Sequence, residues 1–183
     1  MIDTNDNPVL KIARAVHFAA LKHTNQKRKG KDAEPYINHL AEVAATLAVH
    51  TKGQDPNLVV AGLLHDTLED TQTTYEELVS GFGQDVADLV KEVTDDKSLP
   101  KAERKRLQVE NTPHKSVRAK MLKIADKLSN LKAILNNPPQ NWPPERKREY
   151  FDWAKQVVDG CNGVNRGLEE VFAKLYADGR STL

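Results

Sequence analysis

The sequence predicts an all-α fold, a bundle of roughly eight or more helices in a single domain. Apolar residues recur three and four positions apart along most of the chain, which is the helical period. Capping residues followed by proline precede several of these patterns, and glycine or proline ends them. No convincing strand pattern, internal repeat or low-complexity segment is present in the sequence. The chain of 183 residues is long enough for one sizeable core, so we expect one domain over residues 1–183.

Two helices are predicted in the first part of the chain. Asn7–Pro8 supplies an N-cap and a proline at the first helical position of the first helix. Lys22–Lys31 is strongly basic and is expected to be a solvated loop. Pro35–Tyr36 opens the second helix, and Gly53 is its expected stop. The apolar stripe of the first helix is Val9, Ile12, Ala13, Val16, Ala19 and Ala20, and that of the second is Ile37, Leu40, Val43, Ala44 and Leu47.

A third helix is predicted to begin at Asp55–Pro56 and to carry His65, Asp66, Glu69 and Asp70 near its end. Side chains three or four positions apart share one face of a helix, so His65 would lie over Glu69. Asp66 would then lie near both Glu69 and Asp70. Buried carboxylates are costly unless a cation compensates them. A helix whose acidic end simply reaches solvent explains this stretch equally well when it is considered alone.

Two shorter helices and one charged helix are expected next. Overlapping capping boxes at residues 73–77 predict a helix that is interrupted near Gly81–Gly83, and Val86–Val93 marks the following helix. Pro100 is placed to start a strongly charged helix, which Pro113 ends.

The last third of the chain predicts three more helices. Ser116 is expected to cap a long helix whose apolar pattern contains Asp126. A salt-bridged surface aspartate is the ordinary alternative for that residue. Residues 136–144 hold four prolines and form a rigid loop. Two final helices carry the expected core residues Tyr150, Phe151, Trp153, Val157 and Val158, then Val164, Leu168, Val171, Phe172 and Leu175; the expected stripe of the long helix is Met121, Leu122, Ala125, Leu128, Leu131 and Leu135.

The composition is typical of a cytoplasmic protein. The formal net charge is +1, so no global field favours nucleic acid or a membrane as partner. Cys161 is the single cysteine, which excludes an intrachain disulfide and suits a reducing compartment. The first eight residues are polar and acidic, unlike a signal peptide, and no apolar run reaches the roughly 20 residues of a membrane helix.

Several kinds of site are excluded by pattern. Paired cysteines, a His-Glu-x-x-His sequence and a phosphate-binding glycine loop are all missing from the sequence. A Ser/His/Asp triad is compatible with the composition, but no serine lies on a strand-to-helix elbow. His39, His65, Asp66 and Asp126 remain, on three different predicted helices, and facing helices of a bundle can assemble a metal site. Taken alone, His39 is more often a structural histidine than a ligand.

These four residues match the H…HD…D pattern of HD-domain metal-dependent phosphohydrolases. Further segments resemble the hydrolase domain of the Rel/Spo alarmone family, and two resemble its stand-alone small alarmone hydrolases, including the metazoan Spo-type members. The segments of the first kind are Arg28–Lys29, Pro35–His39, Leu64–Thr71 and Asp126–Leu131, and those of the second are Val93–Lys97 and Leu99–Lys105. The similarity extends from about Val9 to Leu175.

The resemblance implies removal of the 3′-pyrophosphate from an alarmone of the ppGpp, pppGpp or ppApp type. His39, His65, Asp66 and Asp126 would bind one divalent cation. This mixed nitrogen and oxygen set suits Mn²⁺ better than an all-oxygen Mg²⁺ site. The cation would polarise the phosphorus and lower the pKa of the attacking water.

The resemblance also assigns roles to nine further residues. Glu69 and Asp70 would orient or deprotonate the water. The other seven match family positions at the substrate: Arg28, Lys29 and Lys101 near phosphates, and Tyr36, Asn130, Trp142 and Tyr150 near the nucleotide. Ser129 stands where many members carry an aromatic residue or histidine, so the choice between guanine and adenine stays open.

Two alternatives remain at this point. One is an HD phosphohydrolase acting on another phosphorylated nucleotide. The other is a non-catalytic module that binds alarmones. Glu69 and Asp70 argue against a pure binder, because two more carboxylates would repel anionic phosphates. The oligomeric state cannot be predicted from the sequence.

Overall fold

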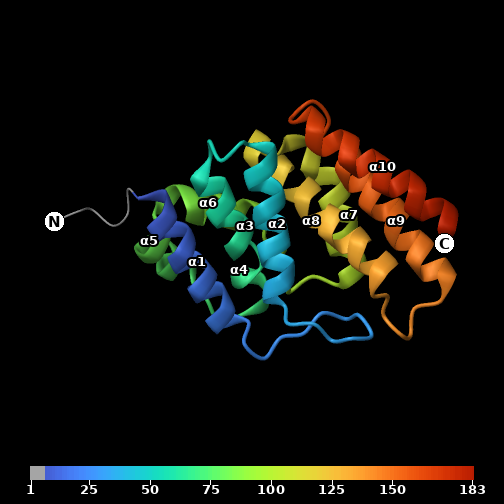
Figure 1. Cartoon of the computed structure of the whole chain (residues 1–183), viewed down its shortest axis with the longest axis horizontal. Helices are drawn as coiled ribbons and strands as arrows, with labels where there is room; N and C mark the ends of the chain where they lie inside the picture. Colours follow the sequence, from blue (N-terminus) through green and yellow to red (C-terminus); the bar gives the residue numbers. More distant parts are fainter. Residues whose placement is uncertain (1–6) are drawn as a thin grey trace. The chain divides into compact units, whose positions relative to one another are not determined.

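The structure, a computed structural model, describes residues 7–183. These residues contain ten α-helices, one short 3-10 helix and no strand (Figure 1). The all-α prediction is therefore confirmed. Within the same residues, no helix is both long and apolar enough to cross a membrane. The expectation about a signal peptide concerns the first eight residues, of which residues 1–6 lie outside the described part.

The described chain divides into two compact units. The first comprises the residues through Gln26 together with Pro35–Asp96, and the second comprises Lys27–Glu34 and Lys97–Leu183. Each unit has its own buried apolar residues. That residues 1–183 form one domain stays a prediction.

The first unit is built around a short helix that is buried over its last seven residues. Its helices are α1 (Pro8–Lys22), α2 (Ile37–His50), α3 (Pro56–Leu64), α4 (Thr67–Asp70), α5 (Tyr75–Phe82) and α6 (Gln84–Val93). Helix α3 packs against α1, α2 and α6, and every residue from Leu58 to Leu64 is buried (Figure 1). Burial on all sides explains why this helix shows no polar face.

Local capping signals were predicted correctly. The Asn7 side chain accepts hydrogen bonds from the first turn of α1, and Asp55 accepts one from Leu58 in α3. Thr74 caps α5 in the same way. Gly53 follows α2 with a φ of +69°, a conformation that few other residues adopt.

The predicted stripe of α1 is only partly correct. Val9 is 74% exposed and Val16 42%. Ala19, which belongs to the predicted stripe, and Ala15, which does not, are both completely buried. Small side chains face the neighbouring helices because α1 packs closely against α2 and α3. Hydrophobicity alone therefore misplaced Val9 and Val16 and missed Ala15.

The predicted third helix is also wrong, because it ends at Leu64 instead of continuing to Asp70. Asp66 has φ −96° and ψ −1°, at the edge of the right-handed helical region. The hydroxyl of Thr67 donates to the carbonyl oxygen of Leu64 at 2.6 Å, and such side-chain bonds compete with the helical ladder. His65 therefore does not lie over Glu69 on one continuous helix.

Helices α2 and α3 approach each other closely at a glycine. A Cβ atom on Gly62 would lie 2.9 Å from Leu47 Cδ1 and 3.3 Å from the Ala44 Cα. Helix α2 carries His39 near its start, and His65 directly follows α3. The absence of a side chain at Gly62 thus lets the two histidine-bearing helices pack closely.

The second unit is organised around the longest helix. It contains α7 (Lys101–Asn111), η1 (Thr112–His114), α8 (Val117–Asn136), α9 (Pro144–Asp159) and α10 (Arg166–Thr182). Helix α8 packs against α9 and α10, and α7 packs against α9 (Figure 1). Ser116 caps α8 as predicted. Several expected core positions are corrected. Val171 is 43% exposed, and five others are only half-buried: Leu135, Tyr150, Trp153, Val164 and Leu175.

Candidate active site

His65 is held in one tautomer by the backbone of α3. Its side chain is buried, and Nδ1 lies 2.9 Å from the carbonyl oxygen of Gly62. A carbonyl oxygen can only accept a hydrogen bond, so Nδ1 carries the proton. Nε2 of the neutral ring then keeps its lone pair for a metal ion, which is the usual arrangement of histidine ligands.

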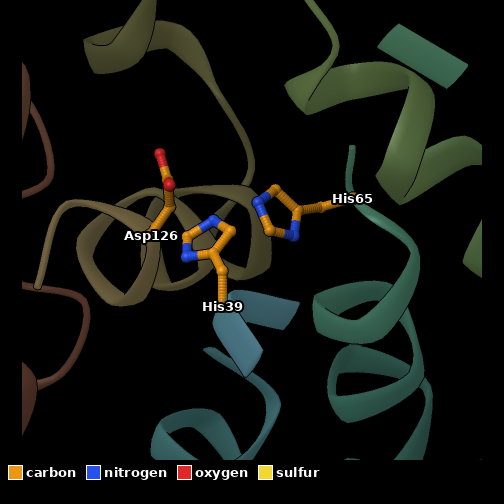
Figure 2. Close-up of side chains that lie close together, drawn as sticks. All are labelled: His39, His65 and Asp126. Carbon is orange, nitrogen blue, oxygen red and sulfur yellow. The ribbon is translucent and has the colours of Figure 1, made fainter. Parts of the chain in front are cut away.

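One carboxylate oxygen of Asp66 lies beside both histidines. Asp66 Oδ2 is 3.2 Å from Nε2 of His65 and 3.6 Å from Nε2 of His39. The Tyr36 hydroxyl donates to the same oxygen at 2.7 Å. The two imidazole rings lie next to each other with centroids 5.2 Å apart (Figure 2). Two buried ring nitrogens and one carboxylate oxygen fit a divalent cation that accepts mixed ligands.

Glu69 and Asp70 lie on α4, the short helix that follows His65–Asp66. The Asp70 amide donates to the backbone oxygen of Asp66 at 2.8 Å, and the Asp95 amide donates to Glu69 Oε2 at 3.3 Å. Burial raises the pKa of Glu69, and the negative charges of Asp66, Asp95 and Asp70 raise it further. A raised pKa makes the ionised carboxylate a stronger base, which suits a group that accepts a proton from water.

Asp126 lies on α8 in the second unit and is also labelled in Figure 2. Its Oδ2 accepts a hydrogen bond from Lys127 Nζ at 2.9 Å, and its Oδ1 accepts one from Asn130 Nδ2 at 2.6 Å. The expected salt bridge exists, but Asp126 is not a surface residue, since its side chain is 13% exposed and that of Lys127 is 4% exposed. Asn130, expected near the nucleotide, orients this carboxylate. Sequence reasoning gave Lys127 no role.

The segment that carries Arg28 and Lys29 is fixed by the backbone. The Arg28 amide donates to the Glu34 carbonyl oxygen at 2.8 Å. A Cβ atom on Gly30 would lie 2.5 Å from the backbone oxygen of Asn137, so only glycine fits there. The segment is a loop, as predicted, with Lys27, Lys29 and Lys31 exposed, but Arg28 is half-buried.

Positive charge is concentrated around Lys101 in the second unit. Burial lowers the pKa of Lys101, and the neighbouring charges of Lys29, Arg146 and Arg104 lower it further. Four cationic side chains in mutual repulsion form a ready binding surface for a phosphate, because an anion relieves the repulsion. Lys29 and Lys101 were both expected at phosphates. Arg104 and Arg146 were missed.

The two predicted aromatic residues also meet in this unit. The rings of Trp142 and Tyr150 have centroids 5.8 Å apart, and Tyr150 is 5.2 Å from Trp153. Lys105 lies 4.5 Å from the Trp153 ring and Arg146 lies 4.4 Å from the Trp142 ring. Lys105 lies four residues after Lys101, and Arg146 lies four residues before Tyr150. Residues four apart share a helix face, so this spacing was the available sequence signal for Lys105 and Arg146.

Two residues of the first unit were also missed near the candidate site. Gln26 Nε2 lies 3.1 Å from Asp70 Oδ2, and Gln26 Oε1 lies 2.6 Å from Nδ1 of the buried His23. Their spacing of three residues places them in one turn of the chain, and this spacing was the available sequence signal.

Comparisons with known proteins give a consistent identification. A family model described as an HD domain matches residues 15–154. Proteins named guanosine-3′,5′-bis(diphosphate) 3′-pyrophosphohydrolase MESH1 share 50% identity over 167 residues in Danio rerio, covering 91% of this chain and 93% of that protein. The Homo sapiens protein of that name shares 50% over 165 residues, covering 90% and 92%.

A solved structure agrees with these sequence relationships. It is described as a metazoan ortholog of SpoT that hydrolyzes ppGpp, and it superimposes with a TM-score of 0.88 at 45% identity. The match covers 92% of this chain and 94% of the other. This protein therefore belongs to the HD domain family and, within it, to the group of the MESH1 3′-pyrophosphohydrolases.

Proposed function

We propose that this protein is a metal-dependent hydrolase that removes the 3′-pyrophosphate from a nucleotide alarmone such as ppGpp or pppGpp. One observation carries the proposal: the Nε2 atoms of two buried histidines lie beside one oxygen of Asp66. Glu69, whose pKa is raised, lies on the next turn of chain. The sequence shared with the MESH1 enzymes supports the choice of substrate.

His39, His65, Asp66 and Asp126 are the proposed ligands of one divalent cation, with Mn²⁺ as the proposed metal. The fixed tautomer of His65 and the mixed donor set support this assignment. Asp126 is included because it supplies the last acidic residue of the H…HD…D pattern. When bound, such a cation supplies a Lewis acid that polarises the phosphoryl group and acidifies water.

Glu69 and Asp70 are the proposed catalytic residues. Their carboxylates hold the attacking water and accept its proton. The water oxygen forms a bond to the phosphorus attached to the ribose 3′-oxygen, and the bond from that phosphorus to the 3′-oxygen breaks. Pyrophosphate and the 5′-phosphorylated nucleotide are the products. The proton that Glu69 or Asp70 accepts from the water is available for the departing 3′-oxygen.

Substrate binding is proposed for seven side chains. Cationic groups offset the charge of the phosphates, and aromatic rings offer surfaces on which a base can stack. These residues are Arg28, Lys29, Lys101, Tyr36, Asn130, Trp142 and Tyr150. The hydroxyl of Tyr36 and the amide of Asn130 also hydrogen-bond proposed metal ligands, so both residues would orient ligands as well. Guanine and adenine alarmones are both kept as candidate substrates, and a cytoplasmic location stays a prediction.

The proposal is tested by incubating the purified protein with ppGpp and with ppApp, each with Mn²⁺ and with a chelator. Chromatography of the products should show pyrophosphate and the 5′-phosphorylated nucleotide only when Mn²⁺ is present. Parallel assays with other 3′- and 5′-phosphorylated nucleotides measure selectivity. A Mn²⁺-loaded protein that binds either alarmone without turnover would contradict the proposal and indicate a sensor. Preferential hydrolysis of another nucleotide would contradict the assigned substrate.

A further inference from the structure

His23 forms an unusual buried contact at the end of α1. Its side chain is 3% exposed, and Nδ1 lies 2.6 Å from Oε1 of Gln26. Within the described residues, Nε2 of the same ring is buried and has no hydrogen-bond partner. The hydrogen bond to Gln26 is therefore the one that orients the ring. A buried polar group with a single hydrogen bond calls for an explanation.

The chemistry of the groups fixes the direction of the hydrogen bonds. An ionised Asp70 carboxylate can only accept, so Gln26 must donate to it through Nε2, at 3.1 Å. Oε1 of Gln26 then faces His23 and can only accept, so Nδ1 of His23 carries the proton. The hydrogen bonds thus run in one direction: His23 donates to Gln26, and Gln26 donates to Asp70.

His23 is also linked, through Tyr36, to the proposed metal ligand Asp66. The ring of Tyr36 stacks on His23, with centroids 5.1 Å apart and planes 22° apart, and its hydroxyl donates to Asp66. The backbone amide of Tyr36 donates to the Gln26 carbonyl oxygen at 3.1 Å. Tyr36 and Gln26 are therefore linked through their backbones. The Tyr36 side chain contacts Asp66, and the Gln26 side chain contacts Asp70, four positions further along the chain.

Asp70 needs such support because α4 is short. The residue is exposed and ends a helix of four residues, which has little stability of its own. A carboxylate that must hold a water molecule at a reactive distance loses efficiency when it samples several rotamers. An amide donor from another segment restricts those rotamers.

We propose that Gln26 is a positioning residue for Asp70 and that His23 holds the Gln26 amide in the required orientation. The proposal rests on the proposed catalytic role of Asp70. Neither residue contacts substrate in this scheme. Their effect should appear in kcat, with KM and metal content unchanged.

The test compares kcat and KM for ppGpp hydrolysis by the full-length, Mn²⁺-loaded protein and its variants. Gln26→Met keeps the side-chain length and removes both hydrogen-bonding atoms. It should lower kcat about 10-fold, the low end for losing an outer-shell contact. Asn25→Ala removes the amide of the exposed neighbouring residue and is the matched control, with kcat within about twofold of wild type.

A double-mutant cycle separates positioning from a purely structural role. In an Asp70→Asn background, Gln26→Met should cause no further loss of kcat, because the group that it positions is already inactive. An equal loss in both backgrounds, or no loss in wild type, would overturn the proposal. If wild type shows no turnover, the proposed function fails and this inference fails with it.

Two substitutions of His23 provide an independent measurement. His23→Asn keeps an N–H donor near the position of Nδ1 and loses the ring, whereas His23→Phe keeps the ring and loses the donor. Thermal unfolding of each variant checks that it is folded. We expect His23→Asn to retain several-fold more activity than His23→Phe. Equal or greater activity of His23→Phe would show that the residue acts only by stacking on Tyr36.

Discussion

At the scale of single residues, the most informative atom is Oδ2 of Asp66. A carboxylate that is largely removed from water is costly unless donors or a cation compensate it. The Tyr36 hydroxyl supplies one donor, and the neutral His65 ring directs its N–H away, toward Gly62. The Nε2 atom of His65 therefore faces Oδ2 as a second electron-rich atom. Two lone pairs directed toward each other are stabilised by a bound cation, which explains the arrangement better than a salt bridge does.

The first prediction concerns Glu69 and Asp70 together. Glu69→Gln combined with Asp70→Asn removes two negative charges next to the phosphates, so the alarmone should bind at least as tightly as to wild type. Metal content should be unchanged, because neither residue is a proposed ligand. Turnover should fall on the order of 10²-fold or more, the usual scale for losing general acid–base catalysis. Calorimetry and a turnover assay measure both effects, and a wild-type rate would exclude the catalytic assignment.

A second prediction separates Arg28 from Lys31 in the basic segment. Arg28 is half-buried, whereas Lys31 is exposed and contributes its backbone amide to Pro138. Arg28→Ala should lower kcat/KM for ppGpp by on the order of 10-fold or more at equal metal content, the loss of a charge-assisted contact. Lys31→Ala is the matched control and should stay within about twofold. Small, similar effects of both would leave only general electrostatic attraction.

The sequence predicted the candidate metal ligands better than it predicted the residues that hydrogen-bond the acidic groups of the site. His65 and Asp66 are adjacent, so their pattern is visible in the sequence. Gln26 contacts Asp70 across 44 positions and Tyr36 contacts Asp66 across 30, and no local pattern encodes such pairs. Resemblance could place Tyr36 at the substrate, but only the fold shows that its hydroxyl contacts a metal-ligand candidate.

At the scale of helices, the N-caps were predictable from the sequence. The point where α3 is interrupted and the buried face of α1 were harder to predict. An N-cap depends on residues two or three positions away, as the bond from Leu58 to Asp55 shows. The interruption between α3 and α4 depends on the buried Thr67 hydroxyl, which substitutes for the backbone, and burial is a tertiary property. The burial of Ala15 in α1 was missed because this residue packs by its small size, which hydrophobicity does not measure.

A third prediction tests the close packing of α2 on α3. Gly62→Ala gains about 1 kcal/mol of helix propensity but adds a methyl group 2.9 Å from the buried Leu47. Overpacking costs about 1–3 kcal/mol, so the free energy of unfolding should fall by about 1 kcal/mol. Gly81→Ala in α5 is the control, because no neighbouring atom among residues 7–183 lies within 4 Å of its added Cβ. It should raise stability by roughly 0.5 kcal/mol. Urea unfolding measures the stability of both variants. If Gly62→Ala is stabilising, α2 and α3 are not packed closely enough to exclude an added methyl group.

At the scale of the whole molecule, the proposed groups are shared between the two compact units. The first carries His39, His65 and Asp66 with the acidic pair of α4, and the second carries Asp126 and the cationic and aromatic side chains. The HD domain match over residues 15–154 includes parts of both units. A cation bound by all four proposed ligands would make the stability of the whole chain depend on metal.

The last prediction measures this dependence. A ligand that binds only the folded protein stabilises it by about 2.7 kcal/mol at 100 times its Kd. For a chain of this length, that corresponds to a rise in Tm on the order of 5–10 °C. Mn²⁺ should therefore raise the Tm of the wild-type protein by about that amount, and a chelator should reverse the rise. Mg²⁺ should raise it less, because two of the proposed ligands are nitrogen atoms.

In variants of the proposed ligands, the informative quantity is the increase in Tm caused by Mn²⁺, and the Tm of the metal-free protein is not. His65→Ala leaves a cavity and lowers Tm without metal, so each variant is compared with and without Mn²⁺. The rise should disappear in His65→Ala and shrink in Asp126→Ala, whereas Lys31→Ala should keep it in full. Elemental analysis should give about one metal ion per wild-type chain and less for the two ligand variants. Equal rises in His65→Ala and wild type would place the cation elsewhere, because a site that loses a buried imidazole cannot keep its affinity.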